Sequence, residues 1–409
     1  MLALRPLFPL LVAAAILLAG NGLFSTVIAV RGAQEGFTAA QIGYIGSANF
    51  LGFLAGCMLV PRMLRAVGHV RVFAALASIA SCATLIMVMA IDPWVWFVAR
   101  ILIGFCFSGL FTTIESWMNS GVSNESRGKV TGVYRIIDIL AVSGGQFLMP
   151  AIGTQGFLLL GIMALMISLS LVPVALGDHS NPRPPKFVRF DLKEVWRLSP
   201  VASASCIAIG MTNSAFRFVG PLFAEVQGFS LSQTATFISL GVVGGAVLQY
   251  PLGILSDRYD RRWILIWTTA GAVLASLFIS FMAVNEVWLI YFGVFLFGAF
   301  SIPLYSLAAA HANDRANADQ YVLVAAGLMF FYGIGASLGP PVSSLMVELY
   351  GPSALFIFIS STHGALALIT LYRMQIRQGV DAEDRSTFNW LIKTSPVMQR
   401  MIQGKRKPK

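Results

Sequence analysis

The sequence predicts an all-α membrane protein in which twelve transmembrane helices form two pseudo-symmetric six-helix bundles. The first observation is the composition, because hydrophobic residues make up 57% of the 409 residues and charged residues only 11%. A soluble core this apolar would aggregate, and the length suits about twelve helices of ~20 residues each. The second observation is a series of apolar runs, and the third is a polar break that divides these runs into two sets.

Six apolar runs precede the polar break and six follow it. Polar or charged turns bound the runs, and such turns must reach water because hydrocarbon cannot satisfy them. In the first half, the expected spans are residues 7–30, 40–60, 70–91, 94–118, 130–150 and 156–176. In the second half, they are residues 200–223, 231–255, 263–284, 287–310, 322–346 and 353–373.

The first run has an alternative interpretation. It follows Arg5 and reaches small residues at Ala19 and Gly20, an arrangement that is similar to a secretory signal peptide. The internal repeat described below favours a retained helix, because the repeat pairs this run with a run in the second half.

The polar break sets the expected domain boundaries. It contains Pro182, Pro184 and Pro185 and then a mixed-charge stretch, which is typical of a linker. The sequence predicts an N-terminal six-helix bundle at residues 1–176, a cytoplasmic linker at 177–199, a C-terminal six-helix bundle at 200–373 and a cytoplasmic basic tail at 374–409.

Basic residues indicate the orientation, since Lys and Arg in short loops are retained on the cytoplasmic side. If the N-terminus lies inside, the only basic residue in the outer turns is Arg31. The inner turns then hold Arg62, Arg65, Arg71, Arg127, Lys129, the basic residues of 183–197 and 258–262, and Arg315. We therefore expect a bacterial inner membrane protein with both termini in the cytoplasm, and we interpret the net charge of +10 as a topology signal, not a nucleic-acid-binding surface.

An internal repeat relates the two halves. An offset of 192 residues aligns Asn21 with Asn213 and Phe24 with Phe216. Later in each half, an offset of 194 residues aligns Gly104 with Gly298, Asn119 with Asn313 and Gly145 with Gly339. Parallel repeats of this kind hold a solute near the membrane midplane, and rocking of one half against the other gives alternating access.

Small residues predict close helix packing in the eleventh span. Gly333, Gly335 and Gly339 would let a neighbouring backbone approach, and Pro340 and Pro341 would bend the helix.

A dense charged turn carries the strongest motif. Residues 253–262 read Gly-Ile-Leu-Ser-Asp-Arg-Tyr-Asp-Arg-Arg and place five charges between two apolar runs. The turn resembles the G-x-L-S-D-R-x-D-R-R loop motif of the major facilitator superfamily, a large group of twelve-helix secondary transporters. The corresponding first-half loop, residues 56–68, has no acid at the equivalent place.

The resemblance implies a gating role for this turn. In the family, the loop acid holds the two halves together on the inner face in the outward-open state. That role carries over to Asp257 and Arg258, with Arg261 and Arg262 as neighbouring gating charges. A basic turn that only fixes the topology is the alternative.

The resemblance extends over nearly the whole chain. Glu-Ser-Trp-Met-Asn at residues 115–119 and the degenerate first loop are similar to the bacterial subgroup called YcaD-like. Resemblance to this subgroup does little to narrow the identity of the solute.

Five ionisable residues fall inside the expected spans, where each costs at least ~2.5 kcal/mol at the bilayer centre unless it is paired or hydrated. Arg100 resembles the arginine of the family's fourth-helix motif, which implies a role in proton transfer, but Ile103 departs from that motif. A buried arginine that binds backbone carbonyls is the alternative.

The other ionisable residues suggest proton coupling. Glu115 and Arg135 could form an ion pair that leaves Asp138 free to titrate, although Arg135 and Asp138 also share one helix face and could pair. A desolvated carboxylate of this kind can exchange a proton near neutral pH. A purely structural network of these residues remains the alternative.

The seventh span contributes the main solute-binding candidate. Arg217 offers a planar fork that suits a carboxylate, phosphate or sulfonate, and its alternative role is to reach the outer headgroups. Asn21 and Asn213, which the repeat pairs, could line the cavity. Further candidates for stacking or hydrogen bonding are Phe216, Trp117 and Tyr332.

The sequence therefore predicts a proton-coupled symporter or antiporter of a small organic metabolite or drug, with an anionic solute suggested by Arg217. A sugar or other neutral-solute porter and a non-transporting sensor are the alternatives. Because no phosphate-binding loop, catalytic triad or HExxH motif occurs, we expect neither an enzyme nor a bound cofactor. The cysteines lack metal-ligand spacing and are expected to be buried: Cys57, Cys82, Cys106 and Cys206. The expected partners are the solute, protons and the lipid bilayer, with the protein itself a monomer.

Overall fold

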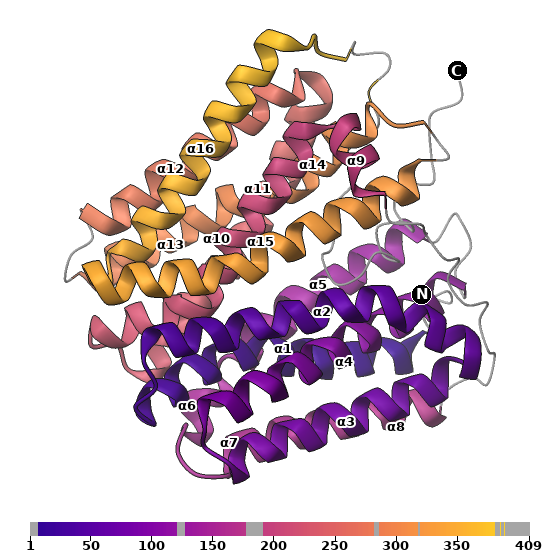
Figure 1. Cartoon of the computed structure of the whole chain (residues 1–409), viewed down its shortest axis with the longest axis vertical. Helices are drawn as coiled ribbons and strands as arrows, with labels where there is room; N and C mark the ends of the chain where they lie inside the picture. Colours follow the sequence, from indigo (N-terminus) through magenta and orange to yellow (C-terminus); the bar gives the residue numbers. More distant parts are fainter. Residues whose placement is uncertain are drawn as a thin grey trace.

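The computed structural model describes residues 7–120, 127–176, 191–281, 286–317 and 320–380, together with Arg385 and Phe388. These residues form sixteen helices and no strand. Eleven helical segments are long and apolar enough to cross a membrane. The predicted all-α membrane fold is therefore confirmed, and Figure 1 shows its two helical bundles, with the first half in indigo to magenta and the second in magenta to yellow.

The helix bounds agree with the expected spans to within a few residues at most ends. The first half contains α1 (Phe8–Gln34), α2 (Ala39–Val67), α3 (His69–Met89), α4 (Pro93–Ser120), α5 (Arg127–Gly145), α6 (Leu148–Ile152), α7 (Leu158–Leu169) and α8 (Leu171–Leu176). The rest of the chain contains α9 (Leu192–Leu198), α10 (Pro200–Val226), α11 (Leu231–Arg258), α12 (Arg261–Phe281), α13 (Val287–Ser301), α14 (Leu304–Asn313), α15 (Tyr321–Tyr350) and α16 (Ala354–Ile376).

Three expected spans are each divided into two helices, α5–α6, α7–α8 and α13–α14. Pro303 explains the last break, because proline lacks the N–H that would continue the helical hydrogen bonds of α13. The expected linker contributes α9, whose Trp196 packs edge-on against Phe331 of α15. The linker residues 177–190 lie outside the described part of the chain.

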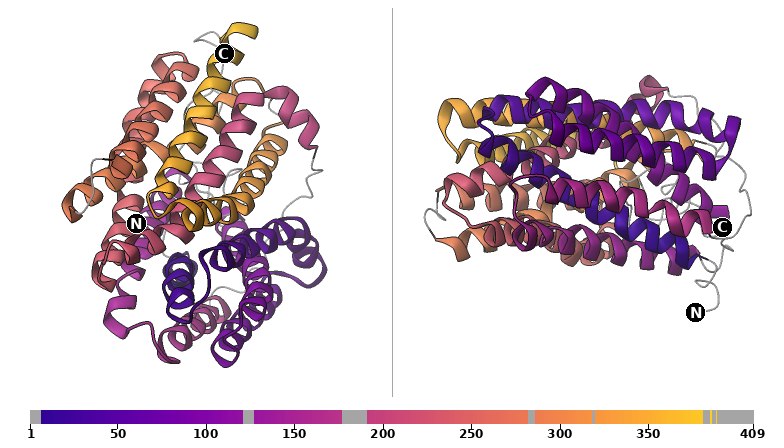
Figure 2. Two further views of the ribbon diagram at one scale, coloured as in Figure 1. Left: turned by 60° about the vertical axis from the view of Figure 1, so that its left-hand side comes forward. Right: turned by 90° about the horizontal axis from the view of Figure 1, so that it is seen from below.

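The second-half helix α10 is long enough to span but does not reach the hydropathy of the other spans. Its middle carries a polar series that its neighbours bury in large part: Thr212, Asn213, Ser214 and Arg217. Most residues of α10 are buried against neighbouring helices, and Asn213 and Arg217 line the cavity between the halves. Figure 2 shows the two bundles from two further sides.

Glycines set the closest crossing of the first half. A Cβ atom added at Gly104 of α4 would collide with the carbonyl oxygen of Asn49, and one added at Gly52 of α2 would collide with that of Ile101. The backbones of α2 and α4 are therefore in direct contact. Such contact suits a bilayer, where helices associate through close van der Waals packing.

The same crossing recurs in the second half at the offsets of the repeat. Gly244 of α11 faces the carbonyl oxygen of Phe295, and Gly298 of α13 faces that of Gly241. A second pair of crossings also repeats, because Gly145 abuts Ala19 between α5 and α1 as Gly339 abuts Met211 between α15 and α10. These matched contacts account for the pseudo-symmetry of the two bundles, and Gly335 and Gly339 provide the close packing that the eleventh span predicts.

The two halves meet near one end of the bundle. We call the end where α1 begins and α16 finishes the termini end, and the end that carries residues 35–38 and 227–230 the turn end. Near the turn end, the backbone N–H of Ala40 donates to Glu348 Oε2 at 3.1 Å. Three more cross-half contacts lie there: Ser47 Oγ with the Ser337 carbonyl, Ser239 Oγ with the Ser143 carbonyl, and Gly43 with Pro340.

We predict that Gly104→Ala lowers the thermal stability of the purified protein, because the added methyl group must push α2 and α4 apart. Overpacking of this kind costs roughly 1–3 kcal/mol. The control is Gly364→Ala in α16, where an added Cβ meets nothing within 4 Å. The unfolding midpoint measured in detergent should fall for Gly104→Ala and stay at the wild-type value for Gly364→Ala. Equal midpoints for the two variants would contradict the direct backbone contact of α2 with α4.

Candidate solute-binding cavity

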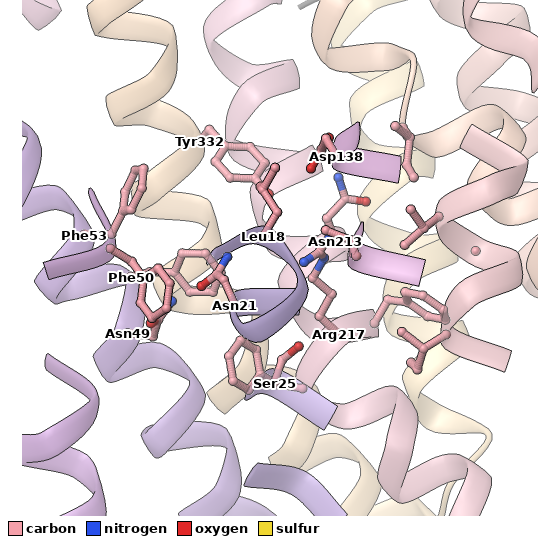
Figure 3. A pocket seen from close by; sticks show the side chains of 18 of the residues that line it. Leu18, Asn21, Ser25, Asn49, Phe50, Phe53, Asp138, Asn213, Arg217 and Tyr332 are labelled. Carbon is pink, nitrogen blue, oxygen red and sulfur yellow. The ribbon is translucent and has the colours of Figure 1, made fainter. Parts of the chain in front are cut away.

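A cavity of about 190 Å³ lies between the two halves of the molecule. Residues of α1, α2, α4 and α5 line it from the first half, and residues of α10, α11, α13 and α15 line it from the second. Figure 3 shows Asn49 and Phe53 on one side of the view, Asp138 and Arg217 on the other, and Asn21 between them. Eight residues singled out from the sequence line this cavity: Asn21, Arg100, Arg135, Asp138, Asn213, Phe216, Arg217 and Tyr332.

Arg135 and Asp138 form a salt bridge in the cavity wall, and both side chains are largely buried. The two residues are three positions apart on α5, so their side chains share one face of the helix. Of the pairings left open by the sequence, the structure contains Arg135 with Asp138.

Glu115 lies elsewhere. It is buried between α4 and α5, where the hydroxyl of Tyr134 donates to Glu115 Oε1 at 3.2 Å. Glu115 is absent from the cavity lining, and so is Trp117, which packs edge-on against His69 with ring centroids 6.0 Å apart. The structure thus separates these two candidates from the other eight.

Arg100 is the most deeply buried cation of the cavity, with 1% of its surface exposed. Its guanidinium carbon lies 4.8 Å from the ring centroid of Phe24 and 5.7 Å from that of Phe218. Cation–π contacts with these rings offset part of the cost of burying the charge. Its Nε and Nη1 atoms have no hydrogen-bond partner among the described residues, so they can donate to a bound anion.

Arg217 lines the cavity from α10 and is half-buried. No carboxylate among the described residues forms an ion pair with it or with Arg100. Among the described residues, the cavity lining therefore contains three guanidinium groups and one carboxylate, Asp138. This arrangement leaves an excess of two positive charges between the halves.

A hydrogen-bonded series leads from the cavity into the second half. Tyr332 and Asn213 share a side-chain hydrogen bond, and Ser301 Oγ donates to Asn213 Oδ1 at 3.3 Å. Ser301 Oγ also lies 3.4 Å from Nε2 of the buried His363 on α16. These contacts hold the Asn213 amide in a defined orientation at the cavity wall.

The structure adds cavity residues that the sequence analysis missed. Asn49, Phe50 and Phe53 come from α2, and Gln249 comes from α11. Gln249 Nε2 donates to Ser306 at 2.7 Å, while Asn49 Oδ1 and Gln249 Oε1 have no partner among the described residues. An amide within an apolar span was the signal that could have identified both.

The charged turn lies at the termini end. Arg261 is 1% exposed and bridges two acids, with Nη2 3.1 Å from Asp257 Oδ1 and Nε 2.8 Å from Asp314 Oδ2. Asp257 also accepts from the backbone N–H of Phe388 at 2.9 Å. All of these partners belong to the second half or the segment that follows it.

The remaining residues of the turn differ in exposure. Arg258 is exposed, and Arg262 binds Asp260 and donates to the carbonyl of Arg377 at 2.7 Å. Burial alone would raise the pKa of Asp260, but the hydrogen bonds from Arg262 outweigh it and hold that pKa below its ordinary value.

The described residues contain no group of three or more His, Cys, Asp or Glu side chains that could hold a metal ion. Three of the cysteines are buried as expected, but Cys82 is exposed. The prediction was wrong for Cys82 because that position of α3 faces away from the neighbouring helices.

The sequence model of the Major Facilitator Superfamily matches residues 10–285 and 237–396 of the chain. An uncharacterised MFS-type transporter of Yersinia pestis (strain Pestoides F) is 24% identical over 360 residues, which span 87% of this chain and 92% of the relative. The MFS-type transporter YcaD of Escherichia fergusonii is 24% identical over 372 residues, which span 90% of this chain and 95% of the relative.

Two solved structures share the fold. The nucleoside transporter NupG matches with a TM-score of 0.75 and 12% identity over 91% of this chain and 100% of NupG. A bacterial homologue of the human lysosomal transporter Spinster, in an inward-facing and unoccupied conformation, matches with a TM-score of 0.65 and 14% identity over 91% of this chain and 95% of the homologue.

We predict that Arg261→Gln destabilises the protein by about 3 kcal/mol, because the change removes a buried partner of both Asp257 and Asp314. Arg258→Gln is the matched control, since it removes an exposed charge from the same turn. Unfolding midpoints in detergent should fall for Arg261→Gln only. A midpoint that stays at the wild-type value in Arg261→Gln would show that the bridge contributes no net stability.

Proposed function

The chain belongs to the major facilitator superfamily, and on that premise we propose that it is a proton-coupled transporter of a small organic anion. The solute would be a metabolite or a drug, and it would cross the bacterial inner membrane by alternating access. The observation that carries this proposal is the pair of cavity arginines, Arg100 and Arg217, that lack a carboxylate partner among the described residues.

The cavity supplies groups for each part of such a solute. Guanidinium forks bind carboxylate, phosphate or sulfonate oxygens with two parallel hydrogen bonds, and burial strengthens the attraction. We assign this role to Arg217 and Arg100. Asn21, Asn213 and Tyr332 would orient the polar remainder, and Phe216 would contact an apolar part.

Asp138 is our candidate for the coupling residue. When Asp138 takes up a proton, its carboxylate becomes neutral and the salt bridge with Arg135 is lost. The excess positive charge of the cavity then rises. A bound anion would in turn favour the protonated acid, and this reciprocity couples the two ligands. The electrostatics of the cavity thus favour uptake of a proton together with an anion. Glu115 remains a proposed second member of the proton-coupling set, acting from its buried site beside Tyr134.

The halves would move as units during transport. We propose residues 1–176 and 200–373 as the moving bundles, 177–199 as the linker and 374–409 as a tail, with the termini end in the cytoplasm. Contacts such as Ala40 with Glu348 join the halves near the turn end, which supports an inward-facing state. Closure of the termini end would then bring the turn at Asp257, Arg258, Arg261 and Arg262 against the first half.

A neutral polar solute is the second candidate. Asn49 Oδ1 and Gln249 Oε1 are buried and have no partner among the described residues, and Asn21 and Asn213 add two more amides. Amides of this kind bind the hydroxyl groups of sugars and related solutes. A binding screen should therefore include both classes.

We predict that the purified protein binds small carboxylates, phosphate esters or sulfonates more tightly than matched neutral compounds. Loss of a charged hydrogen bond in Arg217→Gln or Arg100→Gln should weaken that binding about tenfold or more. Arg71→Gln, which removes an exposed charge, is the control. If sugars bind best and both cavity variants keep wild-type affinity, the anion proposal fails and the second candidate replaces it.

We predict that adding the anion to weakly buffered, purified protein causes proton uptake, because the anion raises the affinity of Asp138 for a proton. Asp138→Asn should bind the solute without a pH change, and the pH electrode reports both results directly. Proton release by the wild-type protein would instead indicate antiport. An unchanged signal in Asp138→Asn would remove Asp138 from the coupling role.

A further inference from the structure

A second, smaller pocket lies at the termini end of the second half, apart from the cavity between the halves. Its volume is about 20 Å³, and it is open to the surface. The first turn of α10 forms one wall, and basic side chains form the rest. Its lining residues are Ser199, Pro200, Val201, Arg262, His311, Arg315, Arg373 and Arg377.

Three of the four arginines have no acidic partner among the residues that the structure describes. Arg315 donates to the carbonyl of Gln378 at 3.0 Å, and Arg377 donates to the carbonyl of Leu198 at 3.0 Å. The guanidinium of Arg373 has neither a hydrogen bond nor an ion pair with any residue that the structure describes. Most of the N–H donors of these three side chains are therefore available to a ligand.

Two described acids lie near the pocket, and each already has an arginine partner. Asp260 pairs with Arg262, and Asp314 pairs with Arg261. Burial and the charges of Arg377 and Arg262 lower the pKa of Arg315, and the nearby acids only partly oppose this effect. Positive charge is thus crowded at this site beyond what the described carboxylates neutralise.

Aromatic residues locate the pocket relative to the bilayer. Trp263 follows Arg262 on α12 and Tyr372 precedes Arg373 on α16, and both rings are exposed. Exposed Trp and Tyr side chains concentrate at the level of lipid headgroups. The basic pocket therefore lies where both lipid phosphates and soluble phosphates can reach it.

We propose that this pocket binds a phosphate group, supplied either by an anionic phospholipid headgroup or by a soluble phosphate compound. Guanidinium forks match phosphate oxygens, and the first turn of α10 adds the positive end of a long helix. A phosphate held here would link α10, α12 and α16 at the termini end. The proposal does not depend on the solute of the central cavity.

The test measures thermal unfolding of the full chain in two arms without any transported solute. The first arm adds inorganic phosphate to detergent-solubilised protein, with chloride at equal ionic strength as the reference. The second arm compares nanodiscs of phosphatidylcholine with and without phosphatidylglycerol. A raised midpoint in the first arm identifies a soluble phosphate site, and a raised midpoint in the second arm alone identifies a headgroup site.

Arg373→Gln is the main variant, because its guanidinium has no described partner and its loss should leave the fold intact. It should weaken the probe's apparent affinity about tenfold or more, and Arg377→Gln should act in the same direction. Arg71→Gln removes an exposed arginine from the first half, and in this variant the probe should raise the unfolding midpoint as much as in the wild-type protein. The proposal is overturned if neither probe raises the wild-type midpoint or if the shift survives in Arg373→Gln.

Discussion

Direct contact between helix backbones is the constraint on which the rest of this structure depends. Within a bilayer, neighbouring helices gain little from hydrophobic burial, so close packing must hold them together. The glycines of α2, α4, α11 and α13 provide such packing at matched positions of the two halves. Each half is therefore braced internally, and the polar side chains gather in the cavity between the two braced halves.

The duplicated scaffold carries an asymmetric set of charges. Asn21 and Asn213 occupy equivalent positions, but Arg217 stands where the first half has Ser25, and Asp138 stands where the second half has Tyr332. The first half thus contributes the acid, while both halves contribute arginine. A solute anion held between Arg100 and Arg217 would contact both halves at once, so its binding would depend on their relative position.

Much of this arrangement could be predicted from the sequence. Long apolar runs and the repeat predicted the fold and the spans, and the search for ionisable residues within spans found the charged residues of the cavity lining, Arg100, Arg135, Asp138 and Arg217. The sequence could not decide which of Glu115, Arg135 and Asp138 form an ion pair, because the pairing depends on which faces of α4 and α5 pack against each other. The helix breaks, α9 and the exposed Cys82 were also missed, since local packing determines them. Asn49 and Gln249 were overlooked because single amides look unremarkable in an apolar run.

The polar character of α10 has a consequence for how the chain is made. A helix that carries Asn213 and Arg217 in its middle partitions poorly into lipid by itself. Its glycine contacts with α15 join it to a helix that the ribosome produces more than a hundred residues later. Stable placement of α10 in the membrane thus depends on assembly with helices already inserted, such as α1, and on helices still to come. The side chains that we propose for solute recognition are therefore the same ones that make insertion of α10 depend on its neighbours.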